Sequence, residues 1–299
     1  MLIVRKEIRK LRIRYPFWTV LAFLICYKFS QTFISKCWNW FIYRVGLHGR
    51  LPSYFSGSLQ LSLRMLVILF LMYLISHIHI FTRRRQPLPG ALVPGVYLLL
   101  VSLLSIGSGL MHAEGFQSQS TILFSITYFI LIGVIEELVY RGVAADILLK
   151  TFLFRSNPSG NRSYDRTGRK VIWEAVLCSG LIFGIVHISN MSYADISGVL
   201  VQMLGAFLMG MVLVAVYYRT ANIYAVIILH AVNDIAAAMP VTILRSEQTI
   251  SDMISGYGIK DVLLLLPYIA VLFVILRPAK TESIWKRWTQ EQTNGMSDL

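Results

Sequence analysis

The chain has 299 residues, of which 56% are hydrophobic and 14% are charged, whereas about 25% of the residues of a soluble domain are charged. The hydrophobic residues form long runs, which excludes an ordinary soluble protein and predicts an all-α, polytopic integral membrane protein. The formal net charge of +13 does not indicate nucleic acid as a partner, because the basic residues lie mainly between the apolar runs and no nucleic-acid-binding motif is present. The lipid bilayer is the expected partner instead.

Eight apolar runs are predicted to be transmembrane helices. In chain order they cover approximately residues 16–35, 61–81, 91–112, 121–140, 171–188, 196–218, 223–239 and 262–276. Residues 143–155 are also apolar but too short to cross, so we expect them to lie in the interface or to dip into the membrane.

The basic residues predict the orientation of these helices. With the N-terminus inside, the inner segments hold most of the lysines and arginines, and the outer links 113–119 and 190–195 hold none. Lysine and arginine concentrate in cytoplasmic loops, so both termini of this multi-pass protein are predicted to be cytoplasmic. Segment 36–59 is the exception, because its three basic residues fall on the outer side.

The stretch 130–142 begins with an apolar segment that runs directly into two adjacent carboxylates, Glu136 and Glu137, and Arg141 lies four residues after the second. A charge costs at least a few kcal/mol inside a membrane, so these residues require an explanation. On a helix Glu137 and Arg141 are one turn apart and able to pair, while Glu136 points about 100° away and is left for other chemistry. The alternative is that the span ends at Glu136 and the charges are merely interfacial.

Two later spans also carry polar side chains. His187 ends the run 171–188, and His230 lies within 223–239 together with Asn233 and Asp234. His230 and Asp234 are four residues apart, hence on one helical face. Any one of these groups alone is better explained by packing. Together they predict that the groups meet in a water-filled cavity inside the helix bundle.

Two kinds of chemistry fit such a cavity. In the first, Glu136 and His187 share a water, one taking its proton and the other fixing its position, while His230 with Asn233 or Asp234 stabilises an oxyanion. In the second, Glu136, His187 and His230 bind zinc, which needs three nitrogen or oxygen ligands and an open position. Both predict hydrolysis of a carbonyl substrate, and the sequence leaves both open.

Three spaced motifs carry a family resemblance. The pattern E-E-x-x-x-R matches 136–141, F-x-x-x-H matches 183–187, and H-x-x-x-N/D matches 230–234. In this order the motifs resemble the CPBP family, which comprises CAAX prenyl endopeptidases and bacteriocin-processing or immunity proteins and is also called the Abi family. The resemblance implies a membrane-embedded protease core over residues 120–240. Residues 1–119 would form an N-terminal region of about three transmembrane helices, and 241–299 a loop, the last transmembrane helix and a cytoplasmic tail.

The resemblance also implies roles for the site residues. Glu136 and His187 would activate the water, Glu137 paired with Arg141 would hold the helix, and His230 with Asp234 would complete the site. The last motif more often ends in Asn, and an ionised Asp234 cannot donate a hydrogen bond, so the oxyanion role is expected of Asn233 or His230 instead. The family has been described both as zinc-dependent and as glutamate-dependent without metal, so the zinc alternative stays open.

The predicted function is therefore an intramembrane endopeptidase that cleaves a membrane-bound peptide or protein, located in a cell membrane. The alternative is a non-enzymatic membrane partner, such as a bacteriocin immunity or sensor-regulating protein, in which the polar cluster only holds the bundle together. A third hypothesis is a proton or ion transporter, because intramembrane carboxylates and histidines also form relays.

Overall fold

The computed structural model describes residues 14–75, 78–81, 85–157 and 163–296, together with residues 7 and 11; the side chains of 78, 79 and 292–296 are not described. Most of the N-terminal basic residues, and Arg83 and Arg84, lie outside these ranges. The described elements are helical, and the only bridge between extended residues among them joins Phe116 and Leu244.

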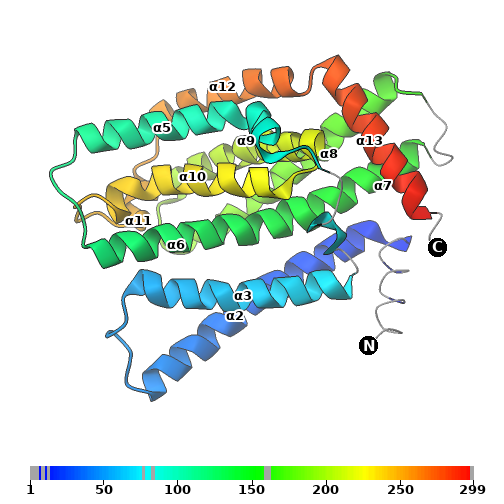
Figure 1. Cartoon of the computed structure of the whole chain (residues 1–299). Helices are drawn as coiled ribbons and strands as arrows, with labels where there is room; N and C mark the ends of the chain where they lie inside the picture. Colours follow the sequence, from blue (N-terminus) through cyan, green and yellow to red (C-terminus); the bar gives the residue numbers. More distant parts are fainter. Residues whose placement is uncertain are drawn as a thin grey trace. The chain divides into compact units, whose positions relative to one another are not determined.

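Seven helical runs in the described ranges are long and apolar enough to cross a membrane. They are α2 (Pro16–Arg44), α3 (Ser53–Leu74), the run Leu88–Met111 that ends in α5 (Val96–Met111), the run Gln119–Ser156 that begins with α6 (Gln119–Glu136), the run Arg166–Ser192 that begins with α8 (Arg166–Ile185), α9 (Ile196–Thr220) and α10 (Ile223–Thr242). Helices α12 (Ile259–Ile275) and α13 (Pro278–Met296) meet at a 65° bend and add an eighth span if they are counted as one (Figure 1). The all-α, polytopic membrane fold is confirmed.

The fourth run differs from its prediction. Residues 143–155 do not form a separate interfacial segment, because the helix continues from α6 through a π-helical stretch, η3 (Glu137–Ala145), into α7 (Asp146–Ser156). Ile147, Leu148 and Leu149 in α7 are buried by protein. Packing against the rest of the chain therefore explains the apolar character of this segment.

The chain forms two compact units. Unit 1 comprises residues 1–83, 98–139 and 227–247, and unit 2 comprises residues 84–97, 140–226 and 248–299. Unit 1 contains α2, α3 and α6 with most of α5 and α10, whereas unit 2 contains α7, α8, α9, α12 and α13 with the short α4 (Leu88–Leu92) and α11 (Ile250–Ser255). The predicted division into 1–119, 120–240 and 241–299 follows motifs along the sequence and stays a prediction.

In unit 1, aromatic packing and a backbone link join the helices. Helix α3 packs on α6 through Phe55 and Phe124, whose ring centroids are 5.0 Å apart. The link before α6 joins the end of α10, where the Gln117 N–H donates to the Ile243 carbonyl at 2.9 Å. These contacts fix the helices that carry the motif residues of this unit.

In unit 2, α8 and α9 approach closely at two glycines spaced four residues apart. A Cβ added at Gly180 would lie 3.0 Å from the Phe207 carbonyl oxygen, and one at Gly184 would lie 2.9 Å from that of Met203. Small residues at this spacing let transmembrane helices pack backbone to backbone. Phe183 lies between these glycines and is buried.

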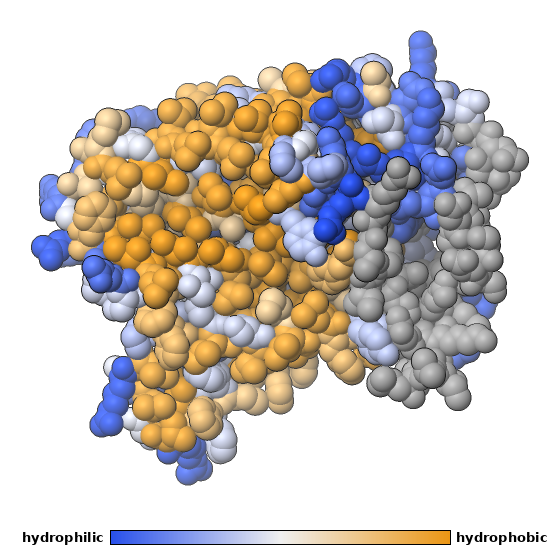
Figure 2. Space-filling view, in the orientation of Figure 1, coloured by the Kyte–Doolittle hydropathy of each residue, from blue (hydrophilic) through white to orange (hydrophobic). Residues whose placement is uncertain are grey.

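Large apolar side chains are exposed along the candidate spans. Examples are Trp18 and Phe29 on α2, Leu104 on α5 and Leu264 on α12, each more than two-thirds exposed. Hydrophobic residues cover much of the face seen in Figure 2. Such a surface would aggregate in water and matches the hydrocarbon interior of a bilayer.

Candidate functional site

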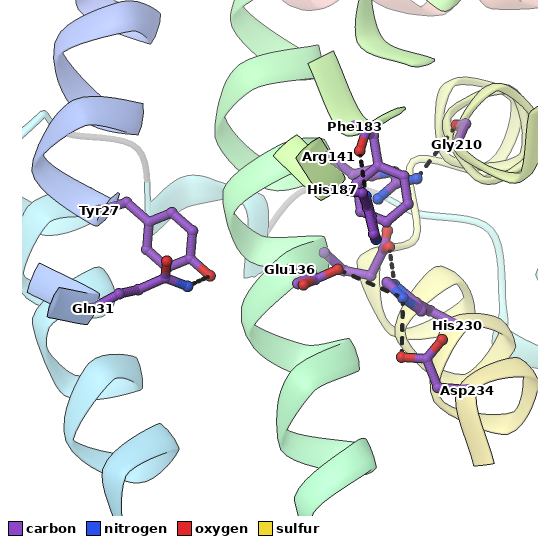
Figure 3. Close-up of polar contacts among 10 residues, drawn as sticks. Tyr27, Gln31, Glu136, Arg141, Phe183, His187, Gly210, His230 and Asp234 are labelled. Carbon is purple, nitrogen blue, oxygen red and sulfur yellow. Dashed lines mark hydrogen bonds and ion pairs between the residues drawn. The ribbon is translucent and has the colours of Figure 1, made fainter. Parts of the chain in front are cut away.

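The imidazole of His230 lies among three carboxylates in unit 1. Its Nδ1 is 2.6 Å from Glu137 Oε1, and its Nε2 is 3.3 Å from Asp234 Oδ2 and 3.8 Å from Glu136 Oε2 (Figure 3). The two glutamates come from the junction of α6 and η3, and the other two residues from α10. The structure thus brings the glutamates of the first motif beside the third motif, and the predicted meeting with His187, which belongs to unit 2, stays a prediction.

Burial divides these four residues into two pairs. The side chains of Glu137 and His230 are 0% and 3% exposed, whereas those of Glu136 and Asp234 are 25% and 24% exposed. A buried carboxylate bonded to a ring nitrogen fixes the orientation of that ring. The partly exposed carboxylates are the ones that water or a substrate is able to reach.

Close packing between α6 and α10 sets this geometry. Gly133 faces Ala231, and a Cβ added at Gly133 would lie 3.1 Å from the Ala231 nitrogen and 3.2 Å from its Cβ. Gly133 lies one helical turn before Glu137, and Ala231 directly follows His230. Because no larger side chain separates the two backbones, Glu137 is able to reach the imidazole.

The π-helical segment η3 begins at Glu137 and contains Arg141. A π-helix has i→i+5 hydrogen bonds, and such segments often occur at functional sites. The predicted one-turn pairing of Glu137 with Arg141 assumed regular α-helical spacing. That pairing stays a prediction, and His230 is the partner of Glu137 that the structure identifies.

Arg141 lies in unit 2 and is completely buried. Its guanidinium carbon is 4.2 Å from the centroid of the Phe183 ring, and its Nη2 lies 3.4 Å from the Gly210 carbonyl oxygen, to which it donates (Figure 3). His187 belongs to the same unit, and its Nδ1 is 2.9 Å from the Phe183 carbonyl oxygen. The first and last residues of the F-x-x-x-H motif therefore interact directly, and that carbonyl accepts a hydrogen bond when Nδ1 carries the proton.

Asn233 takes a different direction from its neighbour Asp234. Its Nδ2 donates a long hydrogen bond of 3.5 Å to the Ser102 hydroxyl on α5. Asp234, in contrast, faces the His230 ring. Of the two residues to which the sequence assigns an oxyanion role, His230 is the one placed beside Glu136 and Asp234.

Sequence reasoning missed polar residues of the N-terminal helices. Tyr27 on α2 is buried, accepts a hydrogen bond of 2.7 Å from Gln31 Nε2, and is within electrostatic range of both Glu136 and Arg64. Arg64 on α3 donates to the Ser35 hydroxyl at 2.6 Å. The available signal was Arg64 itself, a charge inside the apolar run 61–81, near its start, which is costly without polar partners.

The predicted zinc ligands are divided between the two units, with Glu136 and His230 in unit 1 and His187 in unit 2. Nδ1 of His230 is bonded to Glu137, and its Nε2 faces Asp234 and Glu136. Within the described ranges, no group of three or more His, Cys, Asp or Glu side chains is placed as ligands of one metal. The predicted zinc ligands Glu136, His187 and His230 stay a prediction, and the chemistry below uses the protein's own groups.

Comparison with known protein families gives a match to part of the chain. A family model described as type II CAAX prenyl endopeptidase Rce1-like matches residues 118–236, a range that includes the three motifs. No curated protein and no solved structure matches the chain. Helices α2 and α3, which carry Tyr27 and Arg64, lie outside the matched range.

Proposed function

Because residues 118–236 match the family model of Rce1-like type II CAAX prenyl endopeptidases, we propose that this protein is an intramembrane endopeptidase that hydrolyses a peptide bond of a membrane-associated peptide or protein. The family match confirms the resemblance found in the three motifs. It supports a membrane-embedded protease in general, with the bilayer and a membrane-associated substrate as partners. The catalytic roles that follow are our proposal.

The observation that carries the proposal is the His230 cluster, with one ring between a buried carboxylate and two partly exposed ones. We assign Glu136 as the general base. Its carboxylate takes a proton from water, the water oxygen attacks the carbonyl carbon of the substrate, and the proton then passes to the leaving nitrogen. A partly exposed carboxylate is able to contact water, as this role requires.

His230 is proposed to stabilise the negative charge that develops on the substrate oxygen. An imidazole donates on both sides only when both nitrogens carry protons, and here both face carboxylate oxygens. Glu137 holds Nδ1, which directs Nε2 toward Glu136 and Asp234. A fixed donor of this kind typically contributes about 3 kcal/mol to stabilisation of a transition state. Asn233 is a weaker candidate because its amide is bonded to Ser102.

The roles of His187 and Arg141 rest on the motifs. His187 is proposed as the second group that handles the proton of the water, and its bond with the Phe183 carbonyl places a proton on Nδ1, so that Nε2 is the acceptor of the neutral tautomer. Arg141 is proposed to hold the π-helical segment through the Phe183 ring and the Gly210 carbonyl. A location in the cell membrane with both termini cytoplasmic is supported by the distribution of basic residues.

The test is cleavage by purified, reconstituted protein. Prenylated and unprenylated peptides of the same sequence, each with a free C-terminus, are incubated with wild type and with Glu136→Gln, with and without a chelator. We expect wild type to cleave and Glu136→Gln to lose activity at least 100-fold. Loss with chelator alone would favour the zinc mechanism. A cellular phenotype that survives Glu136→Gln in a stably expressed protein would favour the non-enzymatic membrane partner.

A further inference from the structure

Unit 2 has an open pocket beside the first turns of α8. Its volume is about 380 Å³, and its lining consists of Arg166, Arg169, Lys170, Trp173 and Phe273. Three of these five side chains are cationic and two are aromatic. The pocket is separate from the His230 cluster in sequence and in composition.

The basic residues share one face of α8. Residues 166, 169, 170 and 173 follow the spacing i, i+3, i+4 and i+7, which places them along one side of a helix. Like charges at these spacings destabilise a helix unless an anion compensates them. A pocket with this face as its wall is therefore suited to a negatively charged ligand.

The protein's own carboxylates compensate this face poorly. Within the described part of the chain, Arg166 and Arg169 have no carboxylate partner within ion-pair distance. Lys170 Nζ lies 3.7 Å from Glu174 Oε1, and both of these side chains are well exposed to solvent. Asp165 is engaged as the helix cap, where it accepts from the Gly168 N–H at 3.0 Å.

The aromatic residues indicate the depth of the pocket in the membrane. Trp173 lies on α8 just after the charged turn, and its ring centroid is 5.4 Å from that of Phe273 on α12. Tryptophan and other aromatic side chains concentrate at the level of lipid headgroups. One turn further along α8, Leu177 is 44% exposed, so an apolar surface continues from the pocket along a candidate span.

We propose that this pocket binds the phosphate group of an anionic membrane phospholipid. The arginine forks offer bidentate donors to phosphate oxygens, and Lys170 adds a third positive charge. Trp173 and Leu177 would contact the glycerol and the first part of an acyl chain. Basic pockets beside transmembrane helices are a recurrent form of lipid headgroup site. The apolar continuation favours a lipid over free phosphate, which would use only the charged end.

The experiment measures lipid binding to the delipidated full-length protein in mixed micelles. Palmitoyl-oleoyl-phosphatidylglycerol, the matching phosphatidylcholine and inorganic phosphate are titrated separately, and binding is followed by thermal unfolding and by native mass spectrometry. We expect phosphatidylglycerol to raise the unfolding temperature and to remain bound, and the other two to have little effect. Arg166→Gln with Arg169→Gln should weaken phosphatidylglycerol binding roughly 25-fold, about fivefold for each charge.

The control removes the same charge elsewhere in unit 2, with Lys280→Gln and Lys286→Gln on α13. This pair should keep the affinity within about twofold of wild type. Arg166→Lys with Arg169→Lys keeps the charge and loses the bidentate guanidinium donors, so phosphatidylglycerol binding should weaken by an intermediate amount. The proposal would be overturned if the control pair lost as much affinity for phosphatidylglycerol as the two arginine-to-glutamine changes. It would also be overturned if phosphatidylcholine bound as tightly as phosphatidylglycerol, or if inorganic phosphate raised the unfolding temperature as much.

Discussion

Nδ1 of His230 and Oε1 of Glu137 lie 2.6 Å apart, and both side chains are almost completely buried. Two residues separated by 93 positions in the sequence are thus joined by the most buried contact of the cluster. Within a membrane the loss of such a partner leaves a polar group with no water to replace it. The contact therefore links the stability of unit 1 to the orientation of the imidazole.

Substitutions of the two adjacent glutamates should consequently have different effects on stability and on cleavage. Glu137→Ala removes the buried partner of His230 and should lower the free energy of unfolding by about 3 kcal/mol, with loss of cleavage. Glu136→Ala removes a partly exposed carboxylate and should abolish cleavage with little change in stability. Thermal unfolding of the purified variants, measured beside peptide cleavage, separates the two effects. Equal destabilisation by both variants would contradict the division into a positioning and a reactive glutamate.

The close approach of α6 and α10 gives a second prediction. It is tested with a variant, Gly133→Ala, that alters no polar group. Gly133→Ala places a methyl 3.1 Å from the Ala231 nitrogen, so the helices must separate slightly. We expect a loss of about 1–3 kcal/mol in stability and reduced cleavage, since the Glu137–His230 bond lengthens.

The control for this variant is Gly107→Ala on α5. An added Cβ at Gly107 has no atom within 4 Å, so this change should leave activity unaltered and keep or slightly raise stability. If the two alanine variants behave alike, helix propensity rather than the α6–α10 contact determines the effect of Gly133→Ala.

Tyr27 provides a test of whether helices outside the range of the family match contribute to cleavage. Its buried hydroxyl, oriented by Gln31, lies within electrostatic range of Glu136, and the two side chains point toward one another in Figure 3. Tyr27→Phe removes a hydroxyl that interacts electrostatically with this carboxylate, and it should lower kcat/KM about tenfold. Tyr54→Phe on α3, a half-buried tyrosine of the same unit, should leave kcat/KM within twofold. Equal effects of the two variants would exclude a specific contribution of Tyr27.

The sequence was sufficient for the all-α, polytopic membrane fold, and it singled out Glu136, His230 and Asp234, which lie together in unit 1. Long apolar runs report burial in lipid directly, and i, i+4 spacing places His230 and Asp234 on one face whatever the tertiary packing. The pairing of Glu137 with Arg141 stays a prediction, and an apolar pattern does not reveal where a π-helix such as η3 begins. The surroundings of Tyr27 depend on how α2, α3 and α6 pack, which no fixed spacing encodes.

Arg141 and Phe183 provide the last prediction, within unit 2. The guanidinium lies over the ring at 4.2 Å and donates to the Gly210 carbonyl, and both side chains are buried. Arg141→Lys keeps the charge but loses the planar group that stacks on the ring, so we expect stability to fall by about 2 kcal/mol. Arg155→Lys, at an exposed position of α7, is the matched control and should have little effect. If thermal unfolding shows the same temperature for both lysine variants, charge alone suffices at position 141 and the stacking contributes nothing to the fold.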